Sequence, residues 1–377
     1  MSPLLSEDEA LILQTVKKAA AEKIAPRAAE IDELDTFPAD LFDLFRELGL
    51  FGLPVPEEYG GVGARTILFC KVIEEIAAVS LSAANILTQQ TFGIQFLLTA
   101  GNEEQKKRFL PGLASGELHG AGAITEPEAG SDQEPMRTTA LVDGDQYVLN
   151  GNKCFITWAN IADVMTVFAK TQPELGRRGI SAILFERGTP GMRIGRLEKK
   201  MGLRGSPTAE VVFENCRVPR SNLLGAEGDG FKIAMKSLNH GRLAIAALAI
   251  GLAQGALDYA WSYAKNRVQF GHAVSEFQGL RFLVAERATE IEAARSLAYR
   301  AGMEYDVKGP ALPKLAAMTK LFATDVAMRV TVDAVQLLGG YGYTREYPVE
   351  RMMRDAKILQ IVEGTNQIQK VVISNHL

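Results

Sequence analysis

The pattern of hydrophobic positions divides the 377-residue chain into three parts. Residues 1–121 repeat apolar side chains at helical spacing, and so do residues 227–377. Between them, residues 122–226 form short runs of β-branched and aromatic residues, and the pairs Asp143-Gly144 and Asn150-Gly151 are typical of hairpin turns. The sequence therefore predicts an α+β protein, mainly α, with an N-terminal helical domain, a small central β domain and a C-terminal helical domain.

The C-terminal part predicts four long helices with short connections, near residues 231–267, 277–305, 311–338 and 348–362. Four such helices indicate a four-helix bundle. The first would be about 55 Å long at 1.5 Å per residue, which suggests contact with a neighbouring domain or subunit. We expect its apolar stretch, residues 243–256, to be buried, because a membrane span would need about 20 mostly apolar residues.

Composition excludes several classes of partner. The net charge of −4 gives no electrostatic reason to expect binding to nucleic acid or to an anionic membrane. The three cysteines, Cys70, Cys154 and Cys216, are far apart in the sequence, which is typical of a reducing compartment. The four histidines show no ligand spacing, so we predict no metal site. No basic and apolar leader is visible, and the expected location is the cytoplasm.

Near the C-terminus, residues 361–367 place the lone carboxylate of Glu363 between an apolar run and a cluster of glycine, hydroxyl and amide groups. A carboxylate that must remove a weakly acidic proton becomes a stronger base where water is excluded. The apolar neighbours Ile358, Leu359, Ile361 and Val362 could exclude water. The alternative is an exposed carboxylate at a helix end.

Two further segments resemble a known family. They are residues 123–132, which read Ala-Ile-Thr-Glu-Pro-Glu-Ala-Gly-Ser-Asp, and residues 336–343, which read Gln-Leu-Leu-Gly-Gly-Tyr-Gly-Tyr. In this order, and together with Glu363, they resemble the acyl-CoA dehydrogenase family. The second signature continues to match at Glu346, Arg351 and Asp355. The resemblance covers essentially the whole chain.

The resemblance implies FAD, held between the β domain and the C-terminal bundle with an acyl thioester against its ring. Backbone amides and hydroxyls of the first signature suit the polar edge of a flavin, although Gly130-Ser131 alone could be an ordinary turn. Phe155-Ile156-Thr157 matches a family segment that has an aromatic residue on the ring and a threonine near its N5. The implied flavin contacts are Ile124, Thr125, Gly130, Ser131, Phe155, Ile156 and Thr157.

Residues 267–271 resemble the segment that, in this family, reaches the FAD pyrophosphate of a neighbouring subunit. An arginine suits this task because its planar fork pairs two phosphate oxygens, although Arg267 could instead complement a helix dipole. The resemblance therefore implies a homodimer at least, and preferably a tetramer. The implied contacts with the rest of FAD are Arg267, Gln269, Phe270, Gln278, Gln336, Gly339, Gly340, Thr365, Asn366 and Gln367.

The implied reaction converts an acyl-CoA to a trans-2-enoyl-CoA. Glu363 removes the α proton, a hydride passes to flavin N5, and the Glu363 N–H and a ribityl hydroxyl stabilise the thioester oxygen. Some relatives place the base on the long helix directly before an arginine. Here that position is Gly241, before Arg242, so Glu363 is the matching base. Substrate contacts are implied for Ser131, Asn239, Arg242 and Gly364, and a separate electron-transfer flavoprotein is the expected acceptor.

Other functions on the same fold stay open. Reduced flavin could react with oxygen, as in a flavin oxidase or monooxygenase. Asn239 stands where aspartate is frequent, which would allow a dehydrogenase of acyl-carrier-protein thioesters. A non-catalytic acyl- or flavin-binding paralogue would lack the base or the pyrophosphate arginine. Residues 88–90, Thr-Gln-Gln, and Val362 favour a polar or branched short acyl group, unless the glutamines face solvent.

Overall fold

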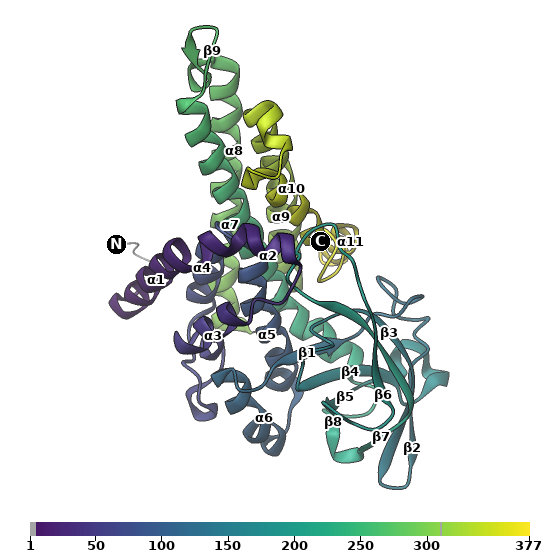
Figure 1. Cartoon of the computed structure of the whole chain (residues 1–377). Coiled ribbons are helices and arrows are strands. Elements are labelled where there is room, and N and C mark those ends of the chain that lie inside the picture. Colours follow the sequence, from purple (N-terminus) through teal and green to yellow (C-terminus); the bar gives the residue numbers. More distant parts are fainter. Residues whose placement is uncertain (1–4, 310) are drawn as a thin grey trace.

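The computed structural model describes residues 5–309 and 311–377; residues 1–4 and Pro310 lie outside the described part. A helical body carries a sheet domain at its lower right and a projecting arm at its top (Figure 1). The N-terminal helices are α1 (Glu7–Ala19), α2 (Ala28–Leu34), α3 (Ala39–Glu47), α4 (Thr66–Ala77), α5 (Leu81–Ala100) and α6 (Glu103–Ser115). Of these, α4 and α5 are the most apolar, and they are buried over most of their length.

The central domain is one mixed sheet. Its strands are β1 (Gly120–Ala123), β2 (Thr139–Asp143), β3 (Gln146–Thr157), β4 (Val164–Lys170), β5 (Ile180–Glu186), β6 (Met192–Leu197), β7 (Thr208–Pro219) and β8 (Leu223–Leu224). They pair in the order β6-β7-β3-β2-β4-β5-β8, and β1 also pairs with β4. The contacts of β1 and β2 with β4 are parallel, and the other pairs are antiparallel.

One of the two predicted hairpins is confirmed and the other is wrong. Asp143-Gly144 joins β2 to β3, and Gly144 has φ +63°. Asn150-Gly151 instead lies inside β3, at an irregularity in its pairing with β7. A Cβ at Gly151 would collide with the backbone and side chain of Thr138. This glycine therefore allows two chain segments to approach closely. A glycine needed for close approach and a glycine needed for a turn look the same in the sequence.

The C-terminal helices are α7 (Gly230–Asn266), α8 (Gln278–Lys308), α9 (Pro313–Leu338), α10 (Pro348–Leu359) and α11 (Asn366–Ser374), and a small hairpin of β9 (Val268–Gln269) and β10 (His272–Ala273) forms the tip of the arm. The predicted bundle is confirmed, but its last predicted helix ends at Leu359 rather than at residue 362. Glu363 therefore lies in the connection between α10 and α11.

Helix α7 is the central rod of the molecule and packs against α4, α5, α8, α9 and α10. Among the described residues, it is the one helix long and apolar enough to cross a membrane, but 78% of its most apolar window is buried inside the protein. Its apolar stretch is thus a buried core helix, as predicted. The approach to α4 is close, because a Cβ added at Gly251 or Gly255 would collide with the α4 backbone or the residue after it.

Candidate active site

Glu363 is held in an unusual backbone conformation between α10 and α11. Its φ is +56° and that of Gly364 is +85°, so two consecutive residues are left-handed. A non-glycine residue in this region is strained by about 1 kcal/mol or more, and such strain is concentrated at functional sites. The side chain of Gln369 stabilises this turn by donating to the carbonyl oxygens of Glu363 (3.2 Å) and Gly364 (2.8 Å).

The carboxylate of Glu363 lies against the backbone of α7. A Cβ added at Gly241 would be 2.7 Å from Oε2 and 2.8 Å from Oε1. Oε2 is buried and has no hydrogen-bond partner among the described residues. Of the apolar neighbours expected to shield the site, Leu359 is buried and Ile358 and Val362 pack against the same core, whereas Ile361 is 49% exposed. The absence of a side chain at Gly241 therefore provides the space that the carboxylate occupies.

Burial raises the pKa of Glu363 to about 7, and the positive charges of Arg242 and Lys320 partly oppose this rise. Arg242 is buried on α7, where its Nη1 donates to Asn239 Oδ1 at 2.7 Å. Burial also lowers the pKa of Arg242, and Glu363 opposes this effect. The arrangement is thus a carboxylate with raised basicity between two buried cations, which is suited to general base chemistry near neutral pH.

The three residues after Gly364 are placed differently from one another. Asn366 was expected to contact the cofactor, but its amide is buried and bonds to Lys320, Thr324 and Asp325 of α9. Thr365 caps α11 by accepting from Ile368 N–H, and Gln367 is exposed. Asn366 therefore stabilises the turn that carries Glu363 from inside the protein.

The expected flavin-facing residues lie on the sheet domain. Phe155 is 65% exposed, Thr125 and Thr157 are partly exposed, and Gly130 and Ser131 are exposed. The N–H of Cys154 donates to the Thr125 carbonyl at 3.0 Å, so the first signature lies beside the end of β3. In contrast, the side chain of Ile156 is packed in the sheet core, which leaves only its backbone for a ligand.

This surface fits a flavin. An aromatic ring as exposed as Phe155, next to two threonine hydroxyls and an open glycine at position 130, offers both a face for ring stacking and donors for a polar ring edge. The backbone turns sharply here, with φ +57° at Phe155 and +64° at Trp158. Both values lie in the left-handed region, which a bulky residue such as tryptophan rarely adopts. Trp158 adopts it while its ring is buried edge-on against Phe37.

Helix α5 connects this surface with the Glu363 site. Gln89 donates to the Thr157 carbonyl at 3.3 Å, and the Gln95 carbonyl accepts from Ser237 Oγ, one turn before Gly241. Gln90 was expected to face either the acyl group or solvent. It does neither, because it is fully buried and its amide bonds to the backbone of Leu113, Leu118 and Gly120.

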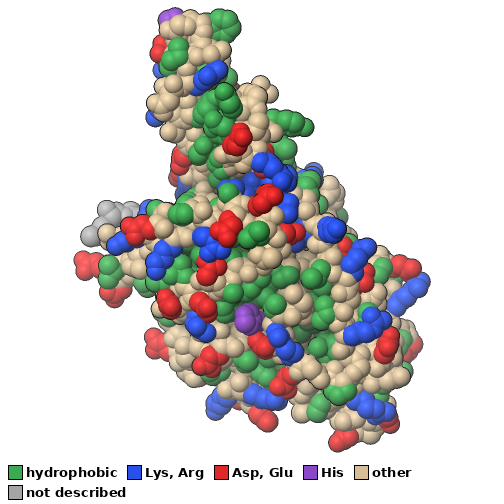
Figure 2. Space-filling model, viewed as in Figure 1, with side chains coloured by type: hydrophobic (Ala, Val, Ile, Leu, Met, Phe, Trp, Pro, Cys, Tyr) green, Lys and Arg blue, Asp and Glu red, His purple; other side chains and the backbone are tan. Residues whose placement is uncertain are grey.

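A second group of expected cofactor contacts lies together at the other end of α7. Arg267 lies over the ring of Tyr341 at 5.7 Å, which brings it beside the connection that follows α9. Gln269, Phe270, Gln278, Gln336, Gly339 and Gly340 are all exposed in this region, and a Cβ at Gly339 or Gly340 would meet no atom within 4 Å. Hydrophobic side chains are visible on this projecting arm in Figure 2, where Phe270 is 92% exposed.

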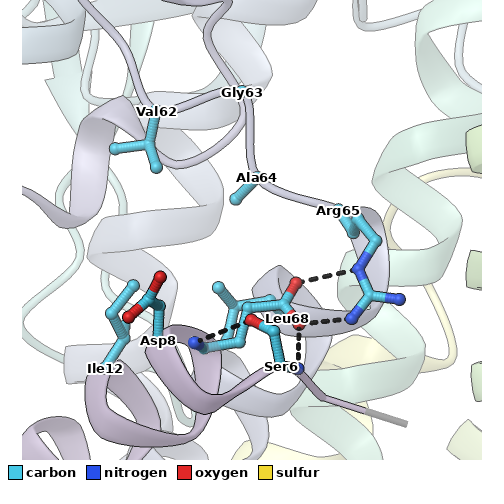
Figure 3. Close-up of a pocket in the computed structure, with 9 residues that line it drawn as sticks. Ser6, Asp8, Ile12, Val62, Gly63, Ala64, Arg65 and Leu68 are labelled. Carbon is cyan, nitrogen blue, oxygen red and sulfur yellow. Dashed lines mark hydrogen bonds and ion pairs between the residues drawn. The ribbon is translucent and has the colours of Figure 1, made fainter.

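A surface groove lies elsewhere, between α1 and the segment before α4 (Figure 3). Its charged residues include Glu9 and Arg65, which pair with each other at 2.8 Å. It contains none of the predicted catalytic or cofactor residues, so we do not assign the reaction to it.

Sequence reasoning missed two buried lysines at the site. Lys153 donates to Ile124 O at 3.0 Å and to the Glu126 carboxylate at 2.7 Å, which fixes the first signature to β3. Lys320 donates to Gly364 O at 3.0 Å beside the catalytic candidate. A signal for Lys320 was present in the sequence, because it follows Ala316 by four positions and therefore falls on the apolar face of a predicted helix.

The fold is a helical domain, a sheet domain and a second helical domain. With a surface that fits a flavin and a shielded carboxylate on a separate turn, it is typical of flavoproteins that act on acyl thioesters. Comparison with family models agrees. The acyl-CoA dehydrogenase N-terminal, middle and C-terminal domain models match residues 6–117, 121–216 and 228–377. The chain belongs to the acyl-CoA dehydrogenase family. It is an oxidoreductase that dehydrogenates an acyl-CoA with FAD as cofactor.

Individual relatives are similar over their full length. An acyl-CoA dehydrogenase of Bacillus subtilis is 47% identical over 374 residues, covering 99% of this chain and 98% of its own. A chain in the structure of the electron transferring flavoprotein of Acidaminococcus fermentans has a TM-score of 0.96, 46% identity and coverage of 100% and 99%. Butyryl-CoA dehydrogenase from Megasphaera elsdenii has a TM-score of 0.95, 41% identity and coverage of 99% and 98%.

Proposed function

We propose that Glu363 is the base that removes the α proton of the acyl thioester. The observation that carries this assignment is the buried, unpartnered Oε2 of Glu363 against Gly241. A carboxylate with a pKa near 7 is a stronger base than one in water, and it is still ionised in a large fraction of molecules at neutral pH. Bound FAD supplies the acceptor for the hydride that leaves the β carbon.

The same turn offers a donor for the thioester oxygen. Among the described residues, no acceptor bonds to the backbone N–H of Glu363, although the carbonyl oxygens of Glu363 and Gly364 both accept from Gln369. A free N–H directed at a developing negative charge stabilises the transition state more than the ground state. We therefore assign this N–H to the thioester oxygen, with Asn239 and Arg242 as substrate-side residues of α7.

The test is Glu363→Gln, which keeps the size of the side chain and removes the base. We expect the variant to bind FAD like the parent, and its flavin reduction by an acyl-CoA to fall at least about 10³-fold under anaerobic conditions. Glu304→Gln on α8, whose half-buried carboxylate pairs with Arg300 and Lys308 away from the site, is the matched control and should be reduced at the parent's rate. Bleaching of the Glu363→Gln flavin at the parent's rate would exclude Glu363 as the base.

We further propose that the chain works as a homodimer at least, and as a tetramer built from two dimers. Gly241 lies on α7 and Arg267 is the first residue after this helix, 26 positions later, or about 39 Å at 1.5 Å per residue. Arg267 is therefore too far from the Glu363 site to serve the same active site. The exposed group around Arg267 and Phe270 is supported as a contact with the FAD of a second subunit.

The acyl group and the electron acceptor are proposed from the relatives. Similarity to butyryl-CoA dehydrogenase supports a short acyl-CoA, and similarity to a chain from an electron transferring flavoprotein structure supports such a flavoprotein as the acceptor. The three free cysteines are buried, which suits the reducing environment of the cytoplasm. Anaerobic titration with straight, branched and long acyl-CoAs would show which one bleaches the flavin.

A further inference from the structure

Lys320 is buried without an anionic partner. Its exposed fraction is 0%, and its Nζ donates to Gly364 O at 3.0 Å and to Asn366 Oδ1 at 2.8 Å. Both acceptors are neutral, and no ion pair is found for Lys320 within the described residues. A buried ammonium is costly unless hydrogen bonds and a nearby negative charge compensate for the lost water. Lys320 has the hydrogen bonds, so the remaining question is which negative charge it faces.

The contacts of Lys320 point to Glu363. The carbonyl it holds belongs to Gly364, the residue directly after the proposed base, whose φ of +85° is unstrained in a glycine but rare in residues with a side chain. A Cβ there would lie 2.8 Å from Gln369 Nε2. The turn is thus held from two sides, by Lys320 of α9 and by Gln369 of α11, while the Oε2 of Glu363 has no partner.

The charged groups around the turn come from two helices. Arg242 faces it from α7, where the neighbouring His240 is neutral because burial lowers its pKa to about 4. Lys320 and Asp325 face it from α9, and the Asp325 carboxylate accepts from the amide of Asn366. Burial lowers the pKa of Lys320 to about 7, and Glu363 is the main group that opposes this. Each of these two groups therefore favours the ionised form of the other.

We propose that Lys320 is a positioning residue for the reaction, which holds the Gly364 carbonyl in place and, by its positive charge, favours the ionised form of the Glu363 carboxylate. Lys320 neither donates nor receives a proton in the reaction. This inference rests on the proposed function of Glu363 as the base. It assigns the position and the ionisation of that base to the influence of Lys320, which lies 43 positions earlier in the sequence and on a different helix.

The direct test is the titration of Glu363 in Lys320→Met. Infrared difference spectra between the parent and Glu363→Gln identify the carboxyl band of Glu363, without any need for turnover. Removing a nearby positive charge favours the protonated carboxyl, so we expect the titration midpoint to move about one pH unit higher in Lys320→Met. Lys320→Gln keeps an amide donor for Gly364 but has no charge, and the same upward shift is expected in it.

The matched control is Thr324→Val. Thr324 bonds to the same Asn366 amide at 3.0 and 3.2 Å, and valine has nearly the same shape without the hydroxyl or any change in charge. We expect its titration midpoint to match that of the parent. The rate of flavin reduction in Lys320→Met, relative to the parent, should fall about tenfold more at pH 6 than at pH 9. In Thr324→Val, any loss of this rate should be the same at all pH values.

Two outcomes would overturn the inference. One is an unshifted Glu363 titration in Lys320→Met, or in Lys320→Gln if the methionine variant does not fold. The other is a uniform loss of rate across pH, which would reduce Lys320 to a purely structural residue. Failure of the proposed function is a separate result, because normal reduction of Glu363→Gln would remove the base assignment while the infrared titration still reports whether Lys320 acts on Glu363.

Discussion

The chemistry of a single residue here depends on a missing side chain. Gly241 has no catalytic group, yet its hydrogen stands where a methyl group would touch both oxygens of the Glu363 carboxylate. The glycine weakens helix α7, because glycine in a helix interior costs about 1 kcal/mol relative to alanine. This destabilising residue stands at the position where the Glu363 carboxylate needs space.

We therefore expect Gly241→Ala to separate stability from activity. Alanine favours the helix, and the carboxylate is the flexible end of a side chain, so the melting temperature should stay equal or rise slightly. Because the carboxylate is displaced, the rate of flavin reduction should fall about 10- to 100-fold, since misplacement of a catalytic group by about 1 Å has an effect of this size. Differential scanning calorimetry and anaerobic stopped-flow absorbance measure the two quantities.

The control for this experiment is Gly302→Ala on α8, where a Cβ would have no neighbour nearer than 3.5 Å. Its reduction rate should equal that of the parent. A Gly241→Ala variant that reduces its flavin at full rate would mean that the carboxylate does not need the position seen in the structure.

Residue identities in the sequence were enough to propose Glu363 as the base, but not to predict its surroundings. The apolar residues beside it in sequence were expected to shield it, and Ile361 instead points largely to solvent. The contact with the carboxylate comes from Gly241 of α7, and the nearby positive charges come from Arg242 of α7 and Lys320 of α9. Contacts between distant segments leave little trace in a single local pattern. Asn366 shows the same limit, because its motif position does not reveal whether its side chain faces the cofactor or the protein.

At the scale of elements, the packing of α4 against α7 is set by glycines. Gly251 and Gly255 are one turn apart, and they let the α4 backbone and its C-terminal end approach α7 so closely that a methyl group would collide with the carbonyl oxygens of Glu74 and Ala78. These carbonyls belong to rigid backbone, so the two segments would have to move apart to admit a side chain.

Gly255→Ala should therefore destabilise the protein, by about 1–3 kcal/mol as in other overpacked cores. Gly279→Ala, near the start of α8, has no atom within 4 Å of the added Cβ and is expected to change stability by less than about 0.5 kcal/mol or to increase it. Urea unfolding of both variants with FAD present gives the comparison. Equal stabilities would show that α4 can shift away from α7 at no cost.

Element boundaries followed from the sequence where local signals decide them, and failed where tertiary contacts do. The Asp143-Gly144 hairpin needs only two residues with the right backbone preference, and it was predicted. Asn150-Gly151 carries the same preference, but its glycine is required by Thr138 from another segment. The end of α10 at Leu359 is likewise set by the turn that is fastened to α9 and α11.

At the scale of the whole molecule, several large hydrophobic side chains are exposed at the projecting arm and the connection after α9. Phe270 is 92% exposed, Tyr343 87%, Phe282 59% and Val268 55%. Large exposed hydrophobic side chains that gather in one region favour an interface between chains. The family resemblance implies that this segment reaches a neighbouring subunit, which remains a prediction, and the distance along α7 is compatible with it.

Phe270→Asp is expected to weaken self-association and to reduce FAD retention together, because the same segment carries the contact and the implied phosphate ligands. Sedimentation velocity measures the first effect, and the ratio of flavin to protein absorbance measures the second. Leu11→Asp, which changes an equally apolar and 63% exposed side chain on α1, should alter neither. An unchanged assembly with full FAD content in Phe270→Asp would exclude this end of the arm as the subunit contact.

Helix α7 carries Gly241, which gives space to the proposed base, and leads at its C-terminal end to Arg267, the proposed contact with a second subunit, so the length of the helix between them fixes their separation. One inserted or deleted residue between Gly241 and Arg267 would turn everything beyond it by about 100° and shift it by 1.5 Å along the axis. Either the Glu363 carboxylate would then lose its contact with Gly241, or the proposed contact of Arg267 with the cofactor of a second subunit would be lost. Insertions and deletions in this gene should therefore survive in the surface turns of the sheet domain, and be eliminated from the middle of α7 even where every substitution is tolerated.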